Sequence, residues 1–259
     1  MQHAGPARPP TAPVLGIPLA VGNYDGVLDW MDAAIAQRSR EYVCVAATHT
    51  VAAAQEDPEL MEAVLAASFT VPDGQPVVWA LRAYGNDASE RIYGPELMER
   101  ACARAAHTGA RIFLYGGREE RLAELTRKLR ERYPGIQIVG GHQPLYRALS
   151  EAEQRAVAEL INAAEPDIVW VGLGVPLQEK WMRTMRPQLD APVLVGVGAA
   201  FDFLSGAVAQ APAWMQRAGL EWLFRLTHEP RRLWRRYARY NPRFAWWVGR
   251  EWLAQRRAR

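Results

Sequence analysis

The segment DIVWVGLGVPLQEKWMRTMRPQLDAPVLVGVGAAFDF, residues 167–203, contains the local pattern that decides the fold. Residues 167–173 form a short apolar run of the kind that becomes a buried strand. Glycines follow, and residues 176–188 have the amphipathic spacing of a helix, with Pro176 in its first turn. A second apolar run at 193–197 predicts another buried strand. Strand, helix and strand in this order favour a parallel pair of strands covered by the helix.

The same alternation extends toward the N-terminus. We expect further strands at 42–47, 111–115 and 136–139, and further helices at 58–68, 95–107, 119–133 and 150–164. The predicted fold class is therefore α/β: a Rossmann-like, mainly parallel sheet with helices on both faces, followed by a C-terminal helical Arg/Trp-rich appendage. Sheets of this kind bind ligands in the loops at the carboxyl ends of their strands.

Composition divides the 259 residues into three parts. Residues 1–13 are rich in Pro and Ala and contain no apolar stretch, so we expect a disordered lead-in without a targeting signal. Residues 14–209 form the predicted α/β body, and residues 210–259 form the appendage. A hydrophobic content of 49% is enough for one substantial core. Cys44 and Cys102 lie in apolar runs and indicate buried thiols in a reducing cytosol.

The appendage concentrates arginine and tryptophan, although the net charge of the whole chain is only +3. Arginine presents a planar fork that fits phosphate, and tryptophan favours a membrane–water boundary. Leu233, Trp234, Tyr237 and Tyr240 recur at helical spacing, with arginines on the other sides, so a basic amphipathic helix is predicted. We expect Pro230 and Pro242 to break this helical segment.

The appendage is therefore predicted to meet an anionic and apolar surface. No window of about 18 apolar residues is free of charge, so we expect a chain that lies on the membrane rather than spanning it. The corresponding location is cytoplasmic and peripheral, on the inner face of the cell membrane. The histidines show no metal-binding spacing, so no metal is expected.

Four short motifs are candidates for chemistry, one at the end of an apolar run and three after predicted strands. Pro72-Asp73-Gly74 places a carboxylate in a tight turn, where it is either a general base or part of an ordinary turn. Gly116 and Gly117 follow a strand and are either phosphate contacts or a generic loop.

The other two motifs leave similar alternatives. Gln178 and Glu179 are either ligand contacts or residues without a binding role. In the second interpretation, Gln178 is exposed and Glu179 complements the helix dipole. Asp202 is either a ligand contact or, as we favour, a helix cap. His49 is either part of the cleft or a packed or solvated side chain.

The motifs occur in a specific order. The set comprises Pro72-Asp73-Gly74, Arg91-Ile-Tyr-Gly94, Phe113-Leu-Tyr-Gly-Gly117, Gly172-Leu-Gly-x-Pro-x-Gln-Glu-x-Trp181, Gly196-Val-Gly-Ala-Ala-Phe-Asp-Phe203 and Leu220-Glu-Trp-Leu-x-Arg-Leu-x-x-Glu-Pro230. It resembles the WecG/TagA/CpsF glycosyltransferases, glycosyltransferase family 26, from about residue 15 to residue 244. The region 221–237 is most similar to the GumM-like exopolysaccharide branch of that family.

The resemblance implies an inverting hexosyltransferase that uses no metal and no other cofactor. It implies a UDP-sugar donor, a polyprenyl-diphosphate-sugar acceptor at the cytoplasmic membrane surface, and a possible homo-oligomer. Asp73 corresponds to the family's proposed base. Arg225, Arg232 and Arg235 correspond to arginines proposed to reach the substrate diphosphate and complete the site.

Motifs and resemblance together give the expected substrate-binding residues. They are His49, Thr50, Arg91, Gly94, Gly116, Gly117, Gly172, Gly174, Gln178, Glu179 and Asp202. The sequence departs from the family pattern at Val45 and Ala47, where the family usually has Thr-x-Asn. Thr48, His49 and Thr50 are candidates to replace that polar pair.

The expected reaction is transfer of glucose onto glucosyl-diphospho-undecaprenol with a β-1,4 linkage, in bacterial surface or exopolysaccharide synthesis. An alternative is transfer of N-acetylmannosamine or its uronic acid onto N-acetylglucosaminyl-diphospho-undecaprenol. A second alternative is a non-catalytic paralogue that binds a nucleotide sugar. A nucleic-acid binder that uses the Arg/aromatic tail is also an alternative, although we expect no nucleic-acid partner because the overall charge is mild.

Overall fold

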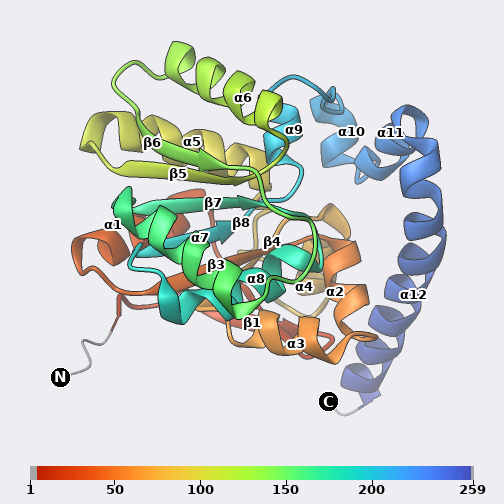
Figure 1. Ribbon diagram of the computed structural model, residues 1–259. Coiled ribbons are helices and arrows are strands. Elements are labelled where there is room, and N and C mark those ends of the chain that lie inside the picture. Colours follow the sequence, from red (N-terminus) through yellow and green to blue (C-terminus); the bar gives the residue numbers. More distant parts are fainter. Residues whose placement is uncertain (1–4, 258–259) are drawn as a thin grey trace.

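A single eight-stranded sheet organises the computed structural model, which describes residues 5–257 (Figure 1). The strands are β1 (Thr11–Val14), β2 (Ile17–Ala20), β3 (Glu41–Ala46), β4 (Phe69–Pro72), β5 (Arg111–Gly116), β6 (Gln137–His142), β7 (Ile168–Gly172) and β8 (Val193–Gly196). Their order in the sheet is β1-β2-β4-β3-β8-β7-β5-β6. All neighbours are parallel except β1 and β2, which form an antiparallel hairpin at one edge.

Helices cover both faces of the sheet, as the fold prediction requires. Those packed on one face are α1 (Tyr24–Ala36), α5 (Gly94–Thr108), α6 (Glu119–Arg132) and α9 (Ala200–Leu204). Those on the other face are α2 (Thr48–Ala54), α3 (Pro58–Leu65), α4 (Gln75–Ala83), α7 (Glu151–Ala163) and α8 (Leu177–Met185), which a short 3-10 turn extends to Gln188. The α/β fold predicted from the alternating pattern is confirmed.

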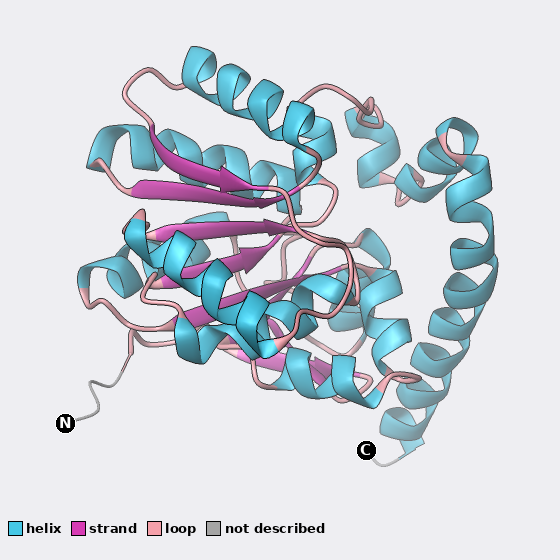
Figure 2. Ribbon diagram, in the orientation of Figure 1, coloured by secondary structure: helices cyan, strands magenta, loops and turns pink. Residues whose placement is uncertain are grey.

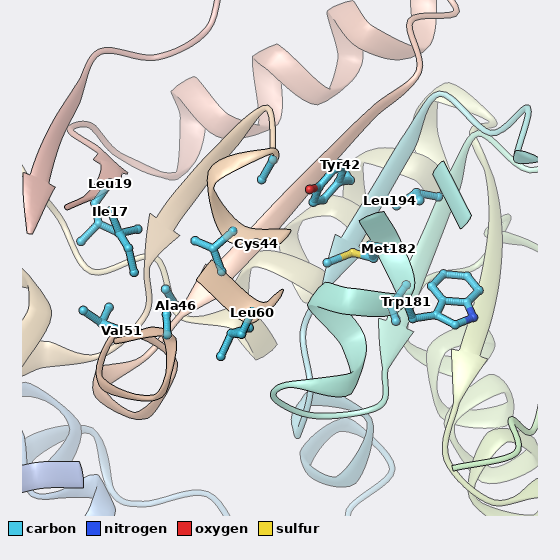
Figure 3. Close-up of a cluster of buried hydrophobic side chains, with 14 of the residues drawn as sticks. Ile17, Leu19, Tyr42, Cys44, Ala46, Val51, Leu60, Trp181, Met182 and Leu194 are labelled. Carbon is cyan, nitrogen blue, oxygen red and sulfur yellow. The ribbon is translucent and has the colours of Figure 1, made fainter. Parts of the chain in front are cut away.

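Alternation along each strand divides the core between the two faces. In β3, Tyr42, Cys44 and Ala46 point into one cluster, whereas Val43 and Val45 point into the other. Figure 3 shows the first cluster, in which these β3 side chains lie among residues such as Leu60 and Met182 from the covering helices. Because both faces are buried, the central strands β3, β7 and β8 are apolar nearly throughout, whereas the edge strands β1 and β6 include exposed residues. The two cysteines are buried free thiols.

The N-terminal part of the body differs from the prediction. Residues 11–13, which we expected in a disordered lead-in, belong to β1. Residues 1–4 of that lead-in lie outside the described part of the chain. β1 and β2 have four residues each, including Pro13 and Pro18, so their own pattern does not reveal them as strands, and pairing with a neighbour is what makes them strands. The hairpin register, Val14 opposite Ile17, buries both side chains in the core.

The appendage consists of α10 (Ala213–Arg217), α11 (Glu221–His228) and α12 (Pro230–Arg257), drawn in blue in Figure 1. Pro230 begins α12, as a first-turn proline should. Pro242, in contrast, does not break the helix, which continues through it to Arg257. Leu233 and Phe244, on either side of the proline, are both buried against the rest of the protein. Both halves of α12 are thus anchored to the protein, and the helix stays continuous despite the missing N–H group of Pro242.

α12 lies along α2, and its contact face is part of the core. Phe244 belongs to the cluster on that side of the sheet, and Tyr240, Trp247 and Trp252 pack against it. Trp247 and Trp252 therefore contact the body rather than facing outward with Trp246, which is exposed. In the described range 5–257, no helix combines the length and the apolar character needed to cross a bilayer.

Candidate active site

A cavity of about 670 Å³ lies between the carboxyl ends of the strands and the appendage. Residues that follow β3, β4, β5, β7 and β8 line one side of it, and residues of α11 and α12 line the other. Figure 2 shows the arrowheads of the parallel strands directed toward the appendage. The cavity is thus at the sheet edge where the sequence predicted ligand binding.

Asp73 lies at the end of β4, in the turn that leads into α4. Its backbone N–H donates to the carbonyl of Ala46, and its carboxylate Oδ1 accepts from the backbone N–H of Gly94 at 3.0 Å. The nearest cation is Arg91, whose Nη2 is 4.0 Å from Oδ1. Burial raises the pKa of Asp73 to about 6, with Glu221 adding to the rise and Arg91 opposing it. Asp73 is therefore a held carboxylate that is ionised at neutral pH and is a stronger base than an exposed one.

Arg91 connects Asp73 to the appendage. Its Nε donates to the carbonyl oxygen of Asp73, and its Nη2 donates to Glu221 Oε2 of α11 at 2.5 Å. Its guanidinium also lies over the ring of Tyr93, 4.3 Å from the ring centre. The sequence predicted a binding role for Arg91 but did not single out Glu221, because an ion pair across 130 positions leaves no local pattern.

The predicted arginines of the appendage differ in where they point. Arg225 lines the cavity and is 15% exposed, with an ion pair of 3.6 Å to Glu229. Arg232 lines the cavity rim, 55% exposed, and pairs with the same glutamate at 2.7 Å. Arg235 is not among the lining residues; it is exposed and lies over the ring of Trp234.

Arg236 takes the place in the cavity that we expected for Arg235. Its side chain is mostly buried, and burial together with Arg225 and Arg232 lowers its pKa. Within residues 5–257, the Nε atoms of Arg225 and Arg236 have no hydrogen-bond partner. We placed Arg236 on an outer side of the helix, but it lies three residues after buried Leu233 and so on the inward stripe. That spacing was the signal that could have identified it.

The predicted glycines have two different roles. Gly117, Gly172 and Gly174 line the cavity, whereas Gly116 does not. A Cβ on Gly116 would lie 2.6 Å from the carbonyl oxygen of Gly172 on the neighbouring strand, so this glycine permits close packing of β5 and β7. Gly94 likewise does not line the cavity, and its contribution is the N–H group that Asp73 accepts.

Gln178 and Glu179 are both buried, which contradicts the interpretation of Gln178 as an exposed side chain, whereas Glu179 does lie in the first turn of α8, as the helix-dipole interpretation requires. Gln178 lines the cavity; its Oε1 accepts from the N–H of Gly174, and its Nε2 donates to Glu179 Oε1 at 2.8 Å. Glu179 is behind the cavity wall, and burial raises its pKa to about 7. Glu179 therefore orients the amide of Gln178 instead of lining the cavity itself.

The remaining predicted residues line the cavity. His49 packs edge-on against Tyr240, and burial lowers its pKa to about 3, so it is a neutral wall residue. Thr50 is buried beside it. Asp202 pairs with Arg121 at 2.9 Å and does not cap α9, whose N-cap is Ala199, so the capping interpretation was wrong.

The wall near Asp73 is apolar where the family pattern has polar residues. Val45 and Ala47 both line the cavity, and Thr48 is adjacent to them. Among residues 5–257, no group of three or more His, Cys, Asp or Glu side chains is arranged to hold a metal ion. The cavity therefore combines a buried carboxylate, cationic side chains and glycine-rich loops, which suits proton removal near a bound anion such as a phosphate.

Comparison with known proteins gives a consistent result. The model of the glycosyl transferase WecG/TagA/CpsF family matches residues 12–258. A protein of Bacillus subtilis (strain 168), named N-acetylglucosaminyldiphosphoundecaprenol N-acetyl-beta-D-mannosaminyltransferase, is 32% identical over 227 residues, which are 87% of this chain and 86% of that protein. A protein of the same name from Bacillus spizizenii (strain ATCC 23059 / NRRL B-14472 / W23) is 36% identical over 183 residues, 71% of this chain and 69% of that protein.

Proposed function

Since the chain belongs to the WecG/TagA/CpsF glycosyltransferase family, we propose that it transfers a sugar from a UDP-sugar onto a polyprenyl-diphosphate-linked sugar. The observation that carries this proposal is the cavity, in which the buried Asp73 carboxylate and the arginines of the appendage line opposite walls. A base and a set of cations are what a displacement at a sugar diphosphate needs when charge develops on the leaving group.

The names of both relatives favour N-acetylmannosamine as the donor sugar and N-acetylglucosaminyl-diphospho-undecaprenol as the acceptor. We therefore adopt the alternative from the sequence and replace glucose transfer as the leading hypothesis. Membership of the exopolysaccharide branch stays a prediction. The cavity wall at Val45 and Ala47 offers no side-chain hydrogen bond to a bound sugar, so selection of the donor sugar depends on other lining residues.

In the proposed reaction, Asp73 accepts the proton of the acceptor hydroxyl. The hydroxyl oxygen forms a bond to the anomeric carbon of the donor while the bond from that carbon to the phosphate oxygen breaks. The departing nucleoside diphosphate takes the electron pair, and Arg225, Arg232 and Arg236 stabilise its charge. A single displacement of this kind inverts the anomeric centre. No metal is needed for the charge balance, since the arginines supply fixed positive charge.

The acceptor requires the protein to work at a bilayer surface. Trp214, Trp222, Trp234 and Trp246 of the appendage are exposed beside its arginines. Such a surface gains about 1 kcal/mol per basic residue near anionic lipid and adds aromatic contacts at the interface. We propose peripheral attachment to the inner face of the cytoplasmic membrane through exposed tryptophans and arginines of the appendage.

A direct assay tests the proposal. The protein is incubated with UDP-N-acetylmannosamine and an N-acetylglucosaminyl-diphospho-lipid, and in parallel with UDP-glucose and a glucosyl-diphospho-lipid. We expect a disaccharide lipid in the first reaction. Product only in the second would restore the glucose hypothesis. Calorimetric binding of the donor without transfer to any acceptor would instead support a non-catalytic nucleotide-sugar-binding protein.

A further inference from the structure

Three charged side chains form a chain across the cavity wall. Glu221 of α11, Arg91 and Asp73 are each mostly buried, with side-chain exposures of 16%, 15% and 20%. Arg91 lies between the two carboxylates, and both compete for its guanidinium. The position of the Arg91 guanidinium between these two carboxylates determines how strongly its positive charge stabilises ionised Asp73.

The competition is unequal. Arg91 Nη2 is 2.5 Å from Glu221 Oε2 but 4.0 Å from Asp73 Oδ1. Arg91 also contacts Asp73 through its Nε, but the acceptor is the backbone carbonyl and not the carboxylate. Among residues 5–257, the Asp73 carboxylate accepts one hydrogen bond, from the Gly94 N–H. A close arginine fork on Asp73 would stabilise the anion and make it a poorer proton acceptor.

We propose that Glu221 is a positioning residue that holds the Arg91 guanidinium away from the Asp73 carboxylate and so keeps that carboxylate free to accept a proton. The role in catalysis rests on the proposed function, in which Asp73 is the base. Because Glu221 belongs to the appendage, docking of α11 sets the basicity of a residue in the body. The appendage then contributes to proton removal as well as to leaving-group stabilisation.

Several charged or titratable groups influence Asp73. They are Tyr24 of α1, Arg91 and Tyr93 from the segment before α5, and Glu221 and Arg225 of α11. Burial is the main cause of the raised pKa of Asp73, and among the charges Glu221 raises it while Arg91 and Arg225 lower it. Loss of the Glu221 charge should therefore lower the pKa of Asp73, and loss of the Arg91 charge should raise it.

The experiment uses these opposite expected shifts in the pKa of Asp73. Wild type, E221Q, R91Q and E56Q are compared in two measurements. Carboxyl-carbon NMR titration follows Asp73, whose signal is identified by its absence in D73N, and it needs no turnover. The pH profile of kcat/KM for sugar transfer follows the same group in the working enzyme, through its acidic limb.

Glu56→Gln is the matched control. Glu56 pairs with Arg239 and Arg243 of α12, so its loss also removes an ionic tether of the appendage. Glu56 does not line the cavity and is not among the groups that act on Asp73. If Glu221 served only to hold the appendage in place, E56Q and E221Q would behave alike in both measurements.

We expect E221Q to move the Asp73 titration and the acidic limb about 1 pH unit lower, and R91Q to move both higher. E56Q should leave both at the wild-type position. The weaker base in E221Q should also lower the plateau of kcat roughly 3-fold, as expected when the pKa of a general base falls by a unit.

The outcomes separate the two proposals. An unchanged Asp73 titration in E221Q overturns the role of Glu221, whether or not the protein transfers sugar. An unchanged acidic limb in an active E221Q, with a shifted NMR titration, removes Asp73 as the base. The wild-type protein could also transfer no sugar while the NMR titration of Asp73 moves lower in E221Q and higher in R91Q. That result would overturn the proposed function and support the control of Asp73 by Glu221.

Discussion

The body and the appendage hold their halves of the cavity by different forces. The body buries two apolar clusters, one on each face of the sheet, and Asp73 is held by backbone hydrogen bonds at the end of a core strand. Within residues 213–257, in contrast, only Leu233 and Phe244 are buried. The rest of the appendage is attached by partly buried aromatics and by polar contacts such as those of Glu56 and Glu251.

One part of the site is therefore preorganised by the fold of the body, and the other part forms only when the appendage is docked. The Asp73 carboxylate, which is the proposed base, and the glycine loops are built into the body, so they are in place whenever the sheet is folded. The arginines and Glu221 arrive with α11 and α12, so their contribution depends on docking of the appendage. For an acceptor held in a membrane, this arrangement would couple completion of the site to the surface where the acceptor is found.

The largest expected effect tests the contribution of the body. Asp73→Asn should lower kcat by about 10²- to 10⁴-fold, because the amide cannot accept the acceptor proton while it can still accept the Gly94 hydrogen bond. Turnover at saturating substrates measures the effect, and an unchanged circular dichroism spectrum shows that the fold is intact. Near wild-type turnover in D73N would mean that the body does not supply the base.

The next effect tests the contribution of the appendage. Arg236→Ala should reduce kcat about 100-fold, since it removes a cavity cation that faces the departing diphosphate. The neighbouring exposed Arg235→Ala is the matched control and should stay within about 2-fold of wild type in solution. A larger loss of kcat in R235A than in R236A would show that α12 docks with a different side toward the body.

A third effect tests how α12 is attached. Phe244→Ala removes the aromatic ring that α12 buries in the core and should cost about 3 kcal/mol of docking free energy. Hydrogen exchange should become faster in α12 and remain slow in β3 and β8. Trp246→Ala, at a side chain that is 66% exposed, should have little effect on exchange. Equal acceleration in the central strands would mean that body and appendage unfold together.

The smallest effect concerns a buried charge in the body. Burial raises the pKa of Glu179 to about 7 in the folded protein, above the value of about 4.5 expected in the unfolded chain. The native state therefore binds the extra proton between these values, and stability falls as pH rises through this window. Glu179→Gln should remove that fall and be on the order of 2 kcal/mol more stable than wild type at pH 8, with little difference near pH 4.5.

Urea denaturation of wild type and E179Q at the two pH values measures this effect. An equal stability difference at both pH values would show that Glu179 is not the group responsible. The same variant keeps an acceptor for Gln178 Nε2, so the oriented amide at the cavity should be preserved. The comparison thus distinguishes the destabilisation caused by the buried charge of Glu179 from the hydrogen bond by which this side chain orients Gln178.

The parts of the fold that were predictable are those with long, strongly patterned segments. β7, α8 and β8 were located from residues 167–203 because each has an unmistakable period or apolar run. The strands β1, β2 and β4 have four residues each, and the helices α2 and α4 begin directly after strand ends. These elements were missed because pairing with distant segments, rather than their own pattern, stabilises them. The helix α1 was also missed, although its 13 residues carry apolar side chains at helical spacing.

The same distinction applies to the site. The turn of Asp73 and the glycines that follow β5 and β7 were identifiable, because proline and glycine impose local geometry. Gln178 was identified as a candidate, but its burial and its hydrogen bond to Glu179 follow from the packing of α8 on the sheet. Arg235 was chosen over Arg236 because motif matching assigns positions along the chain and does not report which side of the helix faces the body.

By itself the sequence determined the mainly parallel α/β sheet, the edge of it at which the cavity lies, the held carboxylate and the basic character of the appendage. Each of these depends on neighbouring residues, through strand and helix periodicity, turn geometry and local charge. Only the tertiary structure decided that Pro242 lies within a continuous helix, that Arg236 faces the cavity and that Glu221 pairs with Arg91. These facts depend on contacts between segments far apart in the chain. One residue of rotation on a helix, about 100°, is enough to exchange the side chain that faces the cavity for one that faces solvent.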